Sequence, residues 1–199
     1  MNIINIFSLI LFILFLFSYV LNLIILKKKS GIKALVLAKG NKGKSINFAE
    51  SLVRISTFLW GIIWLAESLV SNWVTGLLPN LFKNEFLNYL GLFTVVVGLS
   101  YFVLSMLFMK TSWRVGIDKN TKTKLITNGL YKYSRNPAFV GFDFMFIGLF
   151  LTFPNIVTLF ISLLNIISIH LLILQEEKHL EAVFKEDYLI YKRKAPRYL

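Results

Sequence analysis

The chain has 199 residues, of which 56% are hydrophobic and 16% aromatic, and its mean hydropathy is +0.68. This apolar content exceeds that of a soluble domain, so we expect an integral membrane protein. The absence of cysteine excludes a disulfide framework, a thiol nucleophile and a thiolate metal site. Two histidines leave little room for an imidazole cluster, and no metal site is predicted.

Three apolar runs in the first two thirds of the chain are long enough to cross about 30 Å of hydrocarbon. They cover Ile3 to Leu26, roughly Thr57 to Leu78, and Phe86 to Met109. The first run is too long for the apolar core of a secretory signal peptide and lacks a small-residue cleavage site. We therefore expect it to stay in the protein as the first membrane helix.

A fourth apolar run, Ala138 to Leu174, is too long for one membrane helix. Pro154 and Asn155 interrupt it, and this pair favours a helix stop followed by a turn. The pattern predicts a tight hairpin of two shorter helices, 138–153 and 156–174. The result is an all-α integral membrane protein of five transmembrane helices, with residues 1–199 in a single membrane domain.

An amphipathic helix is expected after the last span, over about 175–193. Leu180, Phe184, Tyr188 and Tyr191 follow one another at spacings of four, four and three, which places them on one helix face. Charged residues occupy the opposite face. We expect this C-terminal helix to lie in the cytosol and to pack over a functional site.

The distribution of basic residues predicts the topology. Of the 22 Lys and Arg residues, seven lie in 27–50, seven in 110–137 and six in 175–199. The positive-inside rule places these three segments in the cytosol, with the N-terminus outside and the C-terminus cytosolic in a multi-pass protein. The net charge of +12 then reflects topology and attraction to anionic membrane lipids, and no nucleic-acid partner is expected.

Residues 27–50 combine an amphipathic surface segment with a loop rich in Gly, Lys, Ser and Asn. The GNKGK sequence at 40–44 lacks the preceding strand and the glycine spacing of a phosphate-binding loop. We expect a solvated basic loop there.

The most informative stretches follow the third span. They are NGLYKYSRNPAFVG at 128–141, the paired Glu176 and Glu177, and the Tyr188-x-x-Tyr191 pattern. In this order, and with a Pro-Asn hairpin between them, they resemble the isoprenylcysteine carboxyl methyltransferase and phospholipid methyltransferase superfamily. The resemblance covers about residues 86–199. It implies an integral membrane methyltransferase that uses S-adenosylmethionine at its cytosolic face.

The resemblance also implies site residues. The family's cofactor contacts correspond to Lys124, Leu125, Ile126, Tyr131, Asn136, Pro137, Ala138, Phe139 and Glu176. Glu176 would bind the cationic amino end of the cofactor or a ribose hydroxyl. Catalytic contributions are expected from Arg135, Asn136 and Glu177.

Three positions depart from the commoner pattern of the superfamily. Asn136 stands where the carboxyl methyltransferases have histidine, so this position cannot relay a proton. Phe139 replaces tyrosine and loses its hydroxyl. Leu172 stands where eukaryotic carboxyl methyltransferases have arginine, so a carboxylate clamp is missing unless Arg135 or Arg114 substitutes for it.

The methyl acceptor is expected to be lipophilic or a small molecule. A carboxylate or thiolate needs no base, whereas an amine must first lose a proton, and Glu177, Asp143 and His170 are the nearby candidate bases. For Asp143, two turns past Asn136, the alternatives are a place in the pocket floor and a packing or hydrogen-bond role. Glu67, in the second span, is expected either to pair with a polar residue such as His170 or to hydrogen-bond to a neighbouring backbone.

Several alternative functions stay open at this point. Within the same superfamily they are a phospholipid N-methyltransferase and a small-thiol S-methyltransferase. Outside methyl transfer they are a non-catalytic membrane binding or transport protein, and an oxidoreductase similar to the sterol reductases. The chain contains no G-x-G-x-x-G dinucleotide fingerprint. Binding of S-adenosylhomocysteine, of nothing, or of a nicotinamide dinucleotide would separate the three classes.

Overall fold

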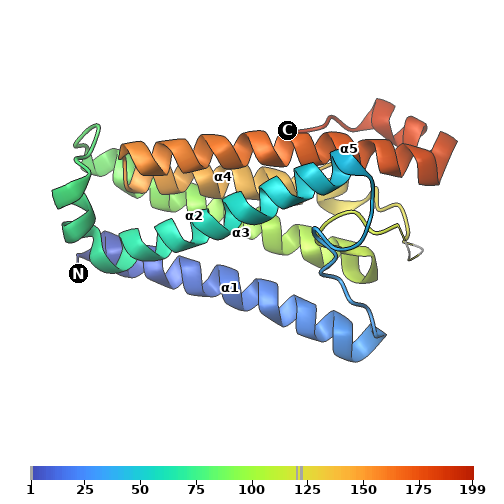
Figure 1. Ribbon diagram of the computed structural model, residues 1–199, viewed down its shortest axis with the longest axis horizontal. Coiled ribbons are helices and arrows are strands. Elements are labelled where there is room, and N and C mark those ends of the chain that lie inside the picture. Colours follow the sequence, from blue (N-terminus) through green and yellow to red (C-terminus); the bar gives the residue numbers. More distant parts are fainter. Residues whose placement is uncertain (1, 120, 122) are drawn as a thin grey trace.

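The computed structural model describes residues 2–119, 121 and 123–199, with the side chains of 71–75 left out. Five helices lie side by side in alternating directions (Figure 1). They are α1 (Ile3–Ser30), α2 (Lys44–Leu77), α3 (Glu85–Met109), α4 (Pro137–Thr152) and α5 (Ile156–Lys194), with short 3-10 turns η1 (Lys110–Ser112) and η2 (Gly129–Lys132). The all-α prediction is confirmed: the described residues form no strand beyond one isolated bridge, between Leu35 and Val115.

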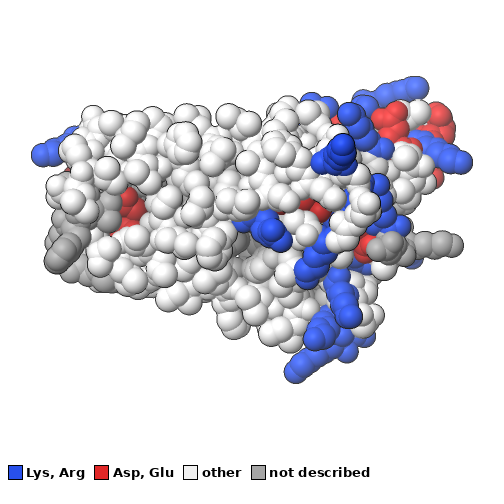
Figure 2. Space-filling model, viewed as in Figure 1, with Lys and Arg blue, Asp and Glu red and all other residues white. Residues whose placement is uncertain are grey.

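Four of the helices, α1, α2, α3 and α5, are long and apolar enough to cross a membrane. The fifth, α4, has 16 residues, or about 24 Å at 1.5 Å per residue. Lys and Arg gather at one end of the bundle (Figure 2). We call this the basic end; it carries the loops 31–43 and 110–136 and the C-terminal half of α5. The opposite end, with the α4–α5 turn, is called the hairpin end.

Two helices exceed their predicted bounds by more than ten residues. α2 begins at Lys44, 13 residues before the predicted start at 57, and α5 continues to Lys194 instead of ending at 174. The additional turns contain polar residues, so hydropathy marks only the apolar part of each helix. The predicted separate C-terminal helix is therefore the continuation of α5. A non-helical Lys185 (φ 47°, ψ −121°) breaks it, and the chain beyond turns back toward the bundle (Figure 1).

The predicted α4–α5 hairpin is confirmed. Asn155 accepts hydrogen bonds from the backbone N–H groups of Val157 and Thr158 at 3.1 and 3.0 Å, and the Thr158 hydroxyl accepts one from the Asn155 N–H. This reciprocal capping satisfies the free amides at the start of α5. The turn is thereby fixed at the place where Pro154 ends the preceding helix.

α3 and α4 pack backbone to backbone through glycines spaced seven residues apart. A Cβ on Gly98 would lie 2.5 Å from the Gly141 carbonyl oxygen, and one on Gly91 would lie 2.7 Å from the Gly148 carbonyl oxygen. Such distances leave no room for a side chain, and small residues are what allow helices to approach this closely in a membrane. The contact fixes α4, and with it the Asn136–Pro137 start of that helix.

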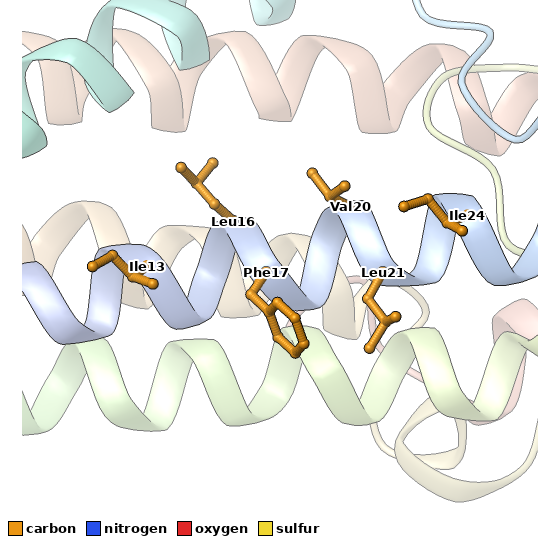
Figure 3. A pocket seen from close by; sticks show the side chains of 6 residues that line it. All are labelled: Ile13, Leu16, Phe17, Val20, Leu21 and Ile24. Atoms are coloured by element: carbon orange, nitrogen blue, oxygen red, sulfur yellow. The ribbon is translucent and has the colours of Figure 1, made fainter.

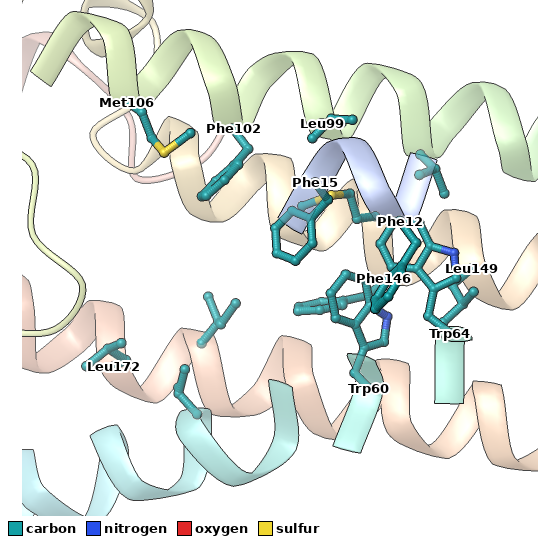
Figure 4. Packing of buried hydrophobic residues seen from close by; sticks show 14 of the residues in the cluster. Phe12, Phe15, Trp60, Trp64, Leu99, Phe102, Met106, Phe146, Leu149 and Leu172 are labelled. Carbon is teal, nitrogen blue, oxygen red and sulfur yellow. The ribbon is translucent and has the colours of Figure 1, made fainter. Parts of the chain in front are cut away.

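Aromatic side chains fill the centre of the bundle (Figure 4). Trp60 on α2 meets Phe146 on α4 edge to face, with ring centroids 4.9 Å apart. Phe15 on α1 contacts both Trp60 and Phe102 on α3. Four helices thus share one aromatic core in geometries that aromatic rings favour.

A polar network crosses the hairpin end inside the apolar bundle. The Glu67 carboxylate accepts a 2.6 Å hydrogen bond from the side chain of Asn155, so its partner is this amide and not His170. The Asn5 side chain donates to the backbone oxygens of Glu67 and Ser68, at 3.1 and 3.2 Å. The network joins α1, α2 and the α4–α5 turn, and it gives hydrogen-bond partners to polar groups that would be costly in lipid.

α1 is the least covered of the four long apolar helices: 17% of the residues in its apolar stretch are buried. Its outer side is a shallow apolar surface without charge (Figure 3). The surface is formed by Ile13, Leu16, Phe17, Val20, Leu21 and Ile24. Such a surface suits contact with lipid chains.

Candidate active site

The segment before α4 is shaped by two predicted features. Gly129 has φ +61°, a left-handed conformation that glycine adopts without strain, and a Cβ there would lie 2.3 Å from the Phe108 ring. Pro137 occupies the first turn of α4, where its missing N–H costs nothing. The turn and the helix start therefore place residues 129–136 tightly against the end of α3.

Glu177 is the centre of the charged cluster at the basic end. Its carboxylate accepts hydrogen bonds from Arg135 at 2.9 and 3.2 Å and from Arg197 at 2.9 and 3.1 Å. The Asn136 side-chain nitrogen lies 3.5 Å from the same carboxylate. Burial raises the pKa of Glu177, but the hydrogen bonds from Arg197 and Arg135 outweigh it and hold the pKa below its usual range. This carboxylate is ionised and fully engaged.

Arg135 and its neighbours bind the C-terminal tail, residues 195–199. The Arg135 guanidinium donates to the carbonyl oxygens of Ala195 at 2.6 Å and Lys192 at 3.2 Å, in addition to Glu177. Its backbone N–H donates to the Pro196 carbonyl oxygen at 2.9 Å. Separate nitrogens of the planar guanidinium reach these three acceptors, whereas the donors of a lysine diverge from a single nitrogen. The tail is thereby fastened over the start of α4.

Two further contacts hold the same region. The Tyr191 hydroxyl donates to the Tyr131 carbonyl oxygen at 2.6 Å, and the Asn136 side chain donates to the Arg197 carbonyl oxygen at 3.2 Å. Leu125 packs against the small cluster formed by Tyr188, Tyr191 and Ala195. The structure thus brings Leu125, Tyr131 and Asn136 close to the C-terminal part of α5 and to the tail.

A stretch that contains this cluster matches a known protein family. Residues 86–187, 102 of the 199 residues, match the phospholipid methyltransferase family. The chain belongs to this family. No curated protein matches the chain. The match contains Arg135, Asn136, Glu176 and Glu177, and it supports the resemblance stated from the sequence.

Glu176 differs from its neighbour Glu177. It lies beyond the apolar stretch 156–174, and in the described part of the chain its carboxylate makes no hydrogen bond or ion pair. Burial, the charge of Glu50 and the charge of Glu177 raise its pKa to about 7. Burial and then Glu176 raise the pKa of the nearby Tyr131. An unpaired, partly buried carboxylate beside Tyr131 is suited to a cationic or hydroxyl-bearing ligand.

The other predicted cofactor residues have mixed surroundings. Lys124 is exposed, and its backbone N–H donates to the Ser112 hydroxyl at 3.1 Å. Ile126 is half-buried. Ala138 and Phe139 lie in the first turn of α4 and pack against the aromatic core. Their side chains therefore support the start of the helix.

Sequence reasoning missed Glu50, which lies outside the family match. This fully buried carboxylate of α2 accepts from the backbone N–H groups of Ala38 at 2.8 Å and Ile117 at 2.7 Å, and it pairs with Lys42 at 2.9 Å. The expectation of a solvated basic loop is wrong at Lys42, whose side chain is 8% exposed. Glu50 needed a buried partner, and the loop supplies it.

The tail residues Arg197 and Tyr198 were also missed, although Tyr198 lies beside two candidate bases. The Tyr198 hydroxyl is 2.6 Å from Nδ1 of His170. Burial and then the charge of Asp143 raise the pKa of Tyr198. The sequence signal was an arginine and an aromatic residue after Pro196, but it carried no indication of where the tail would fold.

Proposed function

We propose that this chain transfers a methyl group from S-adenosylmethionine to an acceptor that reaches the site from the membrane. The family match supports methyl transfer as the reaction class. The single observation that carries the cofactor assignment is that the Glu176 carboxylate has no hydrogen bond or ion pair in the described part of the chain, while its charge is near enough to raise the pKa of Tyr131. The cofactor, when bound, supplies an activated methyl group on a positively charged sulfur.

The chain's own residues have distinct tasks in this proposal. Glu176 binds the cationic amino end of the cofactor or a ribose hydroxyl, with charge-assisted hydrogen bonds. The 124–126 stretch, Tyr131 and the backbone from Asn136 to Phe139 complete the binding surface. Arg135 and Asn136 hold the tail across the site through Glu177 and the tail carbonyl groups. Methyl transfer by displacement depends mainly on the exclusion of water and on a fixed orientation of donor and acceptor.

A carboxylate acceptor, as in isoprenylcysteine methylation, has little support in this site. Leu172 is buried in the core, where an arginine clamp would be needed. Arg135 is engaged by Glu177, and Arg114 is paired with Asp118 at 3.0 Å. Neither arginine is free to substitute for the missing clamp.

We place this site in the cytosol, with the N-terminus outside. The clustering of basic residues at the same end of the bundle supports this orientation (Figure 2).

The test is transfer of labelled methyl from S-adenosylmethionine into a total membrane extract by the purified protein. Label in a membrane-extracted molecule is the expected result. If no label is transferred and S-adenosylhomocysteine does not bind, the proposal fails.

A further inference from the structure

Glu50 joins two segments that are far apart in the sequence. It lies near the start of α2, at the basic end, and both of its oxygens are engaged. One accepts a hydrogen bond from the Ile117 N–H at 2.7 Å and the other from the Ala38 N–H at 2.8 Å. The Lys42 ammonium donates to both at 2.9 Å. One buried side chain thus ties the loop 31–43 to the segment 110–117.

The backbone around this carboxylate is shaped to meet it. Gly116 has φ +91°, and a Cβ there would lie 2.8 Å from Oε1 of Glu50 and 2.7 Å from Cα of Leu37. Ala38 adopts φ +52°, in the left-handed region that favours glycine, at the residue whose N–H donates to Glu50. Backbone strain of this kind is kept where the surrounding contacts require it, often at a functional site.

Glu50 and Glu176 lie at nearly the same level of the bundle. The Ser56 hydroxyl of α2 is 3.0 Å from the Ser168 hydroxyl of α5, and the two helices run in opposite directions (Figure 1). Toward the basic end, Glu50 is six residues from Ser56 and Glu176 is eight residues from Ser168. These separations are about 9 and 12 Å of helix. The electrostatics agree, since burial, then the charge of Glu50 and then that of Glu177 raise the pKa of Glu176.

The segment that Glu50 holds also reaches other parts of the proposed cofactor surface. The Ser112 hydroxyl accepts a hydrogen bond from the Lys124 N–H at 3.1 Å, at the start of the 124–126 stretch. His179, three residues after Glu176, forms a hydrogen bond with the Asp118 backbone. Displacement of the 110–117 segment would therefore disturb the surface on both sides.

We propose that Glu50 is a positioning residue of the cofactor site: it holds the 31–43 and 110–117 segments around the cofactor, and its charge acts on Glu176. This inference rests on the proposed methyltransferase function. Glu50 itself touches no ligand in this assignment, because the chain occupies both of its oxygens. The family match begins at residue 86, so the assignment gives a role to the part of the chain that precedes it.

Several charged or titratable groups surround Glu176, and most of them are balanced. Glu177 is paired with two arginines, and Glu50 is paired with one lysine. The groups are Glu50 of α2, Lys42 of the loop 31–43, Tyr131 of η2, Glu177 and His179 of α5, Arg135 before α4 and Arg197 of the tail. Glu50→Gln removes one negative charge and leaves the lysine, so Glu176 should ionise at a lower pH.

The experiment measures the affinity of S-adenosylhomocysteine by calorimetry, on the full-length protein in detergent micelles, from about pH 5.5 to 8.5. Wild type is compared with Glu50→Gln, Glu50→Asp and the control Glu67→Gln. Glu67 is a buried carboxylate of the same helix, 17 residues or about 25 Å away, and glutamine there retains an oxygen for Asn155. Titration of the ligand is common to all four proteins, so a difference between their midpoints belongs to the protein.

The affinity of wild type should fall as the pH drops below about 7, because Glu176 becomes protonated. In Glu50→Gln the midpoint of this fall should move down by about 0.5 to 1 pH unit. Glu50→Asp keeps the charge, so its midpoint should stay within about 0.3 unit of wild type. Its shorter side chain cannot span both N–H groups, and the affinity at pH 8 should fall about 3- to 10-fold. The control should match wild type in both respects.

A second measurement needs no substitution. Saturating S-adenosylhomocysteine should slow hydrogen exchange of the wild-type amides in 36–42 and 113–119 by about tenfold or more, because the ligand stabilises the state in which Glu50 holds them. The amides of 155–160, at the hairpin end, should not respond.

Three results overturn the assignment: equal midpoints for Glu50→Gln and wild type, the same midpoint shift in Glu50→Asp as in Glu50→Gln, or no protection of the two segments on binding. A purely structural role of Glu50 would lower the affinity at every pH without moving the midpoint. If the Glu50 variants do not fold, the exchange measurement on wild type decides. Failure of wild type to bind S-adenosylhomocysteine would instead refute the proposed function.

Discussion

The two ends of the bundle both bury carboxylates, but they treat them differently. At the hairpin end, Glu67 is held by the neutral amide of Asn155 in a network of amides and hydroxyls. At the basic end, Glu177 is held by two arginines, while its neighbour Glu176 makes no hydrogen bond within the described chain. The first network joins helices. The second joins the tail to α4 and leaves one carboxylate without a partner in the described chain, and this difference supports the proposal that the site lies at the basic end.

The largest expected effect on stability comes from Glu177→Ala. Removing this carboxylate leaves Arg135, whose side chain is 8% exposed, with an uncompensated charge. Breaking a buried pair in this way costs about 3 to 5 kcal/mol. Thermal unfolding in detergent should show the loss, and the tail should become accessible to carboxypeptidase. The comparable Glu67→Ala change removes one neutral partner and should cost about 1 to 3 kcal/mol. Equal losses at the two ends would contradict the distinction drawn between them.

Much of this arrangement could be predicted from the sequence, and the reasons are local. Some features depend only on residues within a few positions of one another. They are the apolar runs, the Pro154–Asn155 turn, the Gly129 turn and the start of α4 at Pro137. The early start of α2 could not be predicted because its first turns are polar and carry no hydropathy signal. Glu50 was missed because its partners come from a loop before it and a segment 67 residues later. The tail was missed because Arg197 finds its partner 20 residues earlier.

The next effect concerns pH and separates the adjacent glutamates. The pKa of Glu176 in the fold, about 7, exceeds its ordinary value of 4.5, so the folded state binds more protons between these values. Stability should therefore fall as the pH rises from about 5 to 8. Glu176→Gln should remove this fall and raise the melting temperature by a few degrees at pH 8, about 1 to 2 kcal/mol. Melting curves of both proteins at pH 5 and pH 8 test it. A Gln variant less stable than wild type at pH 8 would show that the carboxylate is paired.

Glu177 should behave oppositely. Its pKa is lowered, so its contribution to stability is present above its ordinary pKa and is lost as the pH falls through the lowered value. Wild type should lose stability below about pH 4 more steeply than Glu177→Gln. Parallel acid titrations of the two proteins, followed by tryptophan fluorescence, provide the measurement. Identical acid profiles would show that the ion pairs of Glu177 do not contribute to stability.

A smaller effect is expected from Arg135→Lys. Lysine keeps the charge, but its donors diverge from one nitrogen and do not match the spread of Glu177 and the carbonyl groups of Ala195 and Lys192 around the guanidinium. About 1 to 2 kcal/mol of stability and part of the turnover should therefore be lost. Melting temperature and methyl transfer are measured on the same preparation. Arg193→Lys is the control, since this exposed arginine lies in the last turn of α5, at the same end of the bundle. Full tolerance of lysine at both positions would place Arg135 among arginines that merely reach the lipid headgroups.

The most direct test of the central claim is the affinity of S-adenosylhomocysteine for Glu176→Gln, measured by calorimetry at pH 8 against Glu181→Gln. Glu181 is a half-exposed residue paired with Lys192 at 3.3 Å, so its loss should change the affinity by less than about twofold. Loss of the charge-assisted hydrogen bond at Glu176 should cost about 1.5 to 3 kcal/mol, or roughly 10- to 150-fold in Kd. Equal affinities of the two variants would contradict the claim that the unpaired carboxylate at the basic end binds the cofactor.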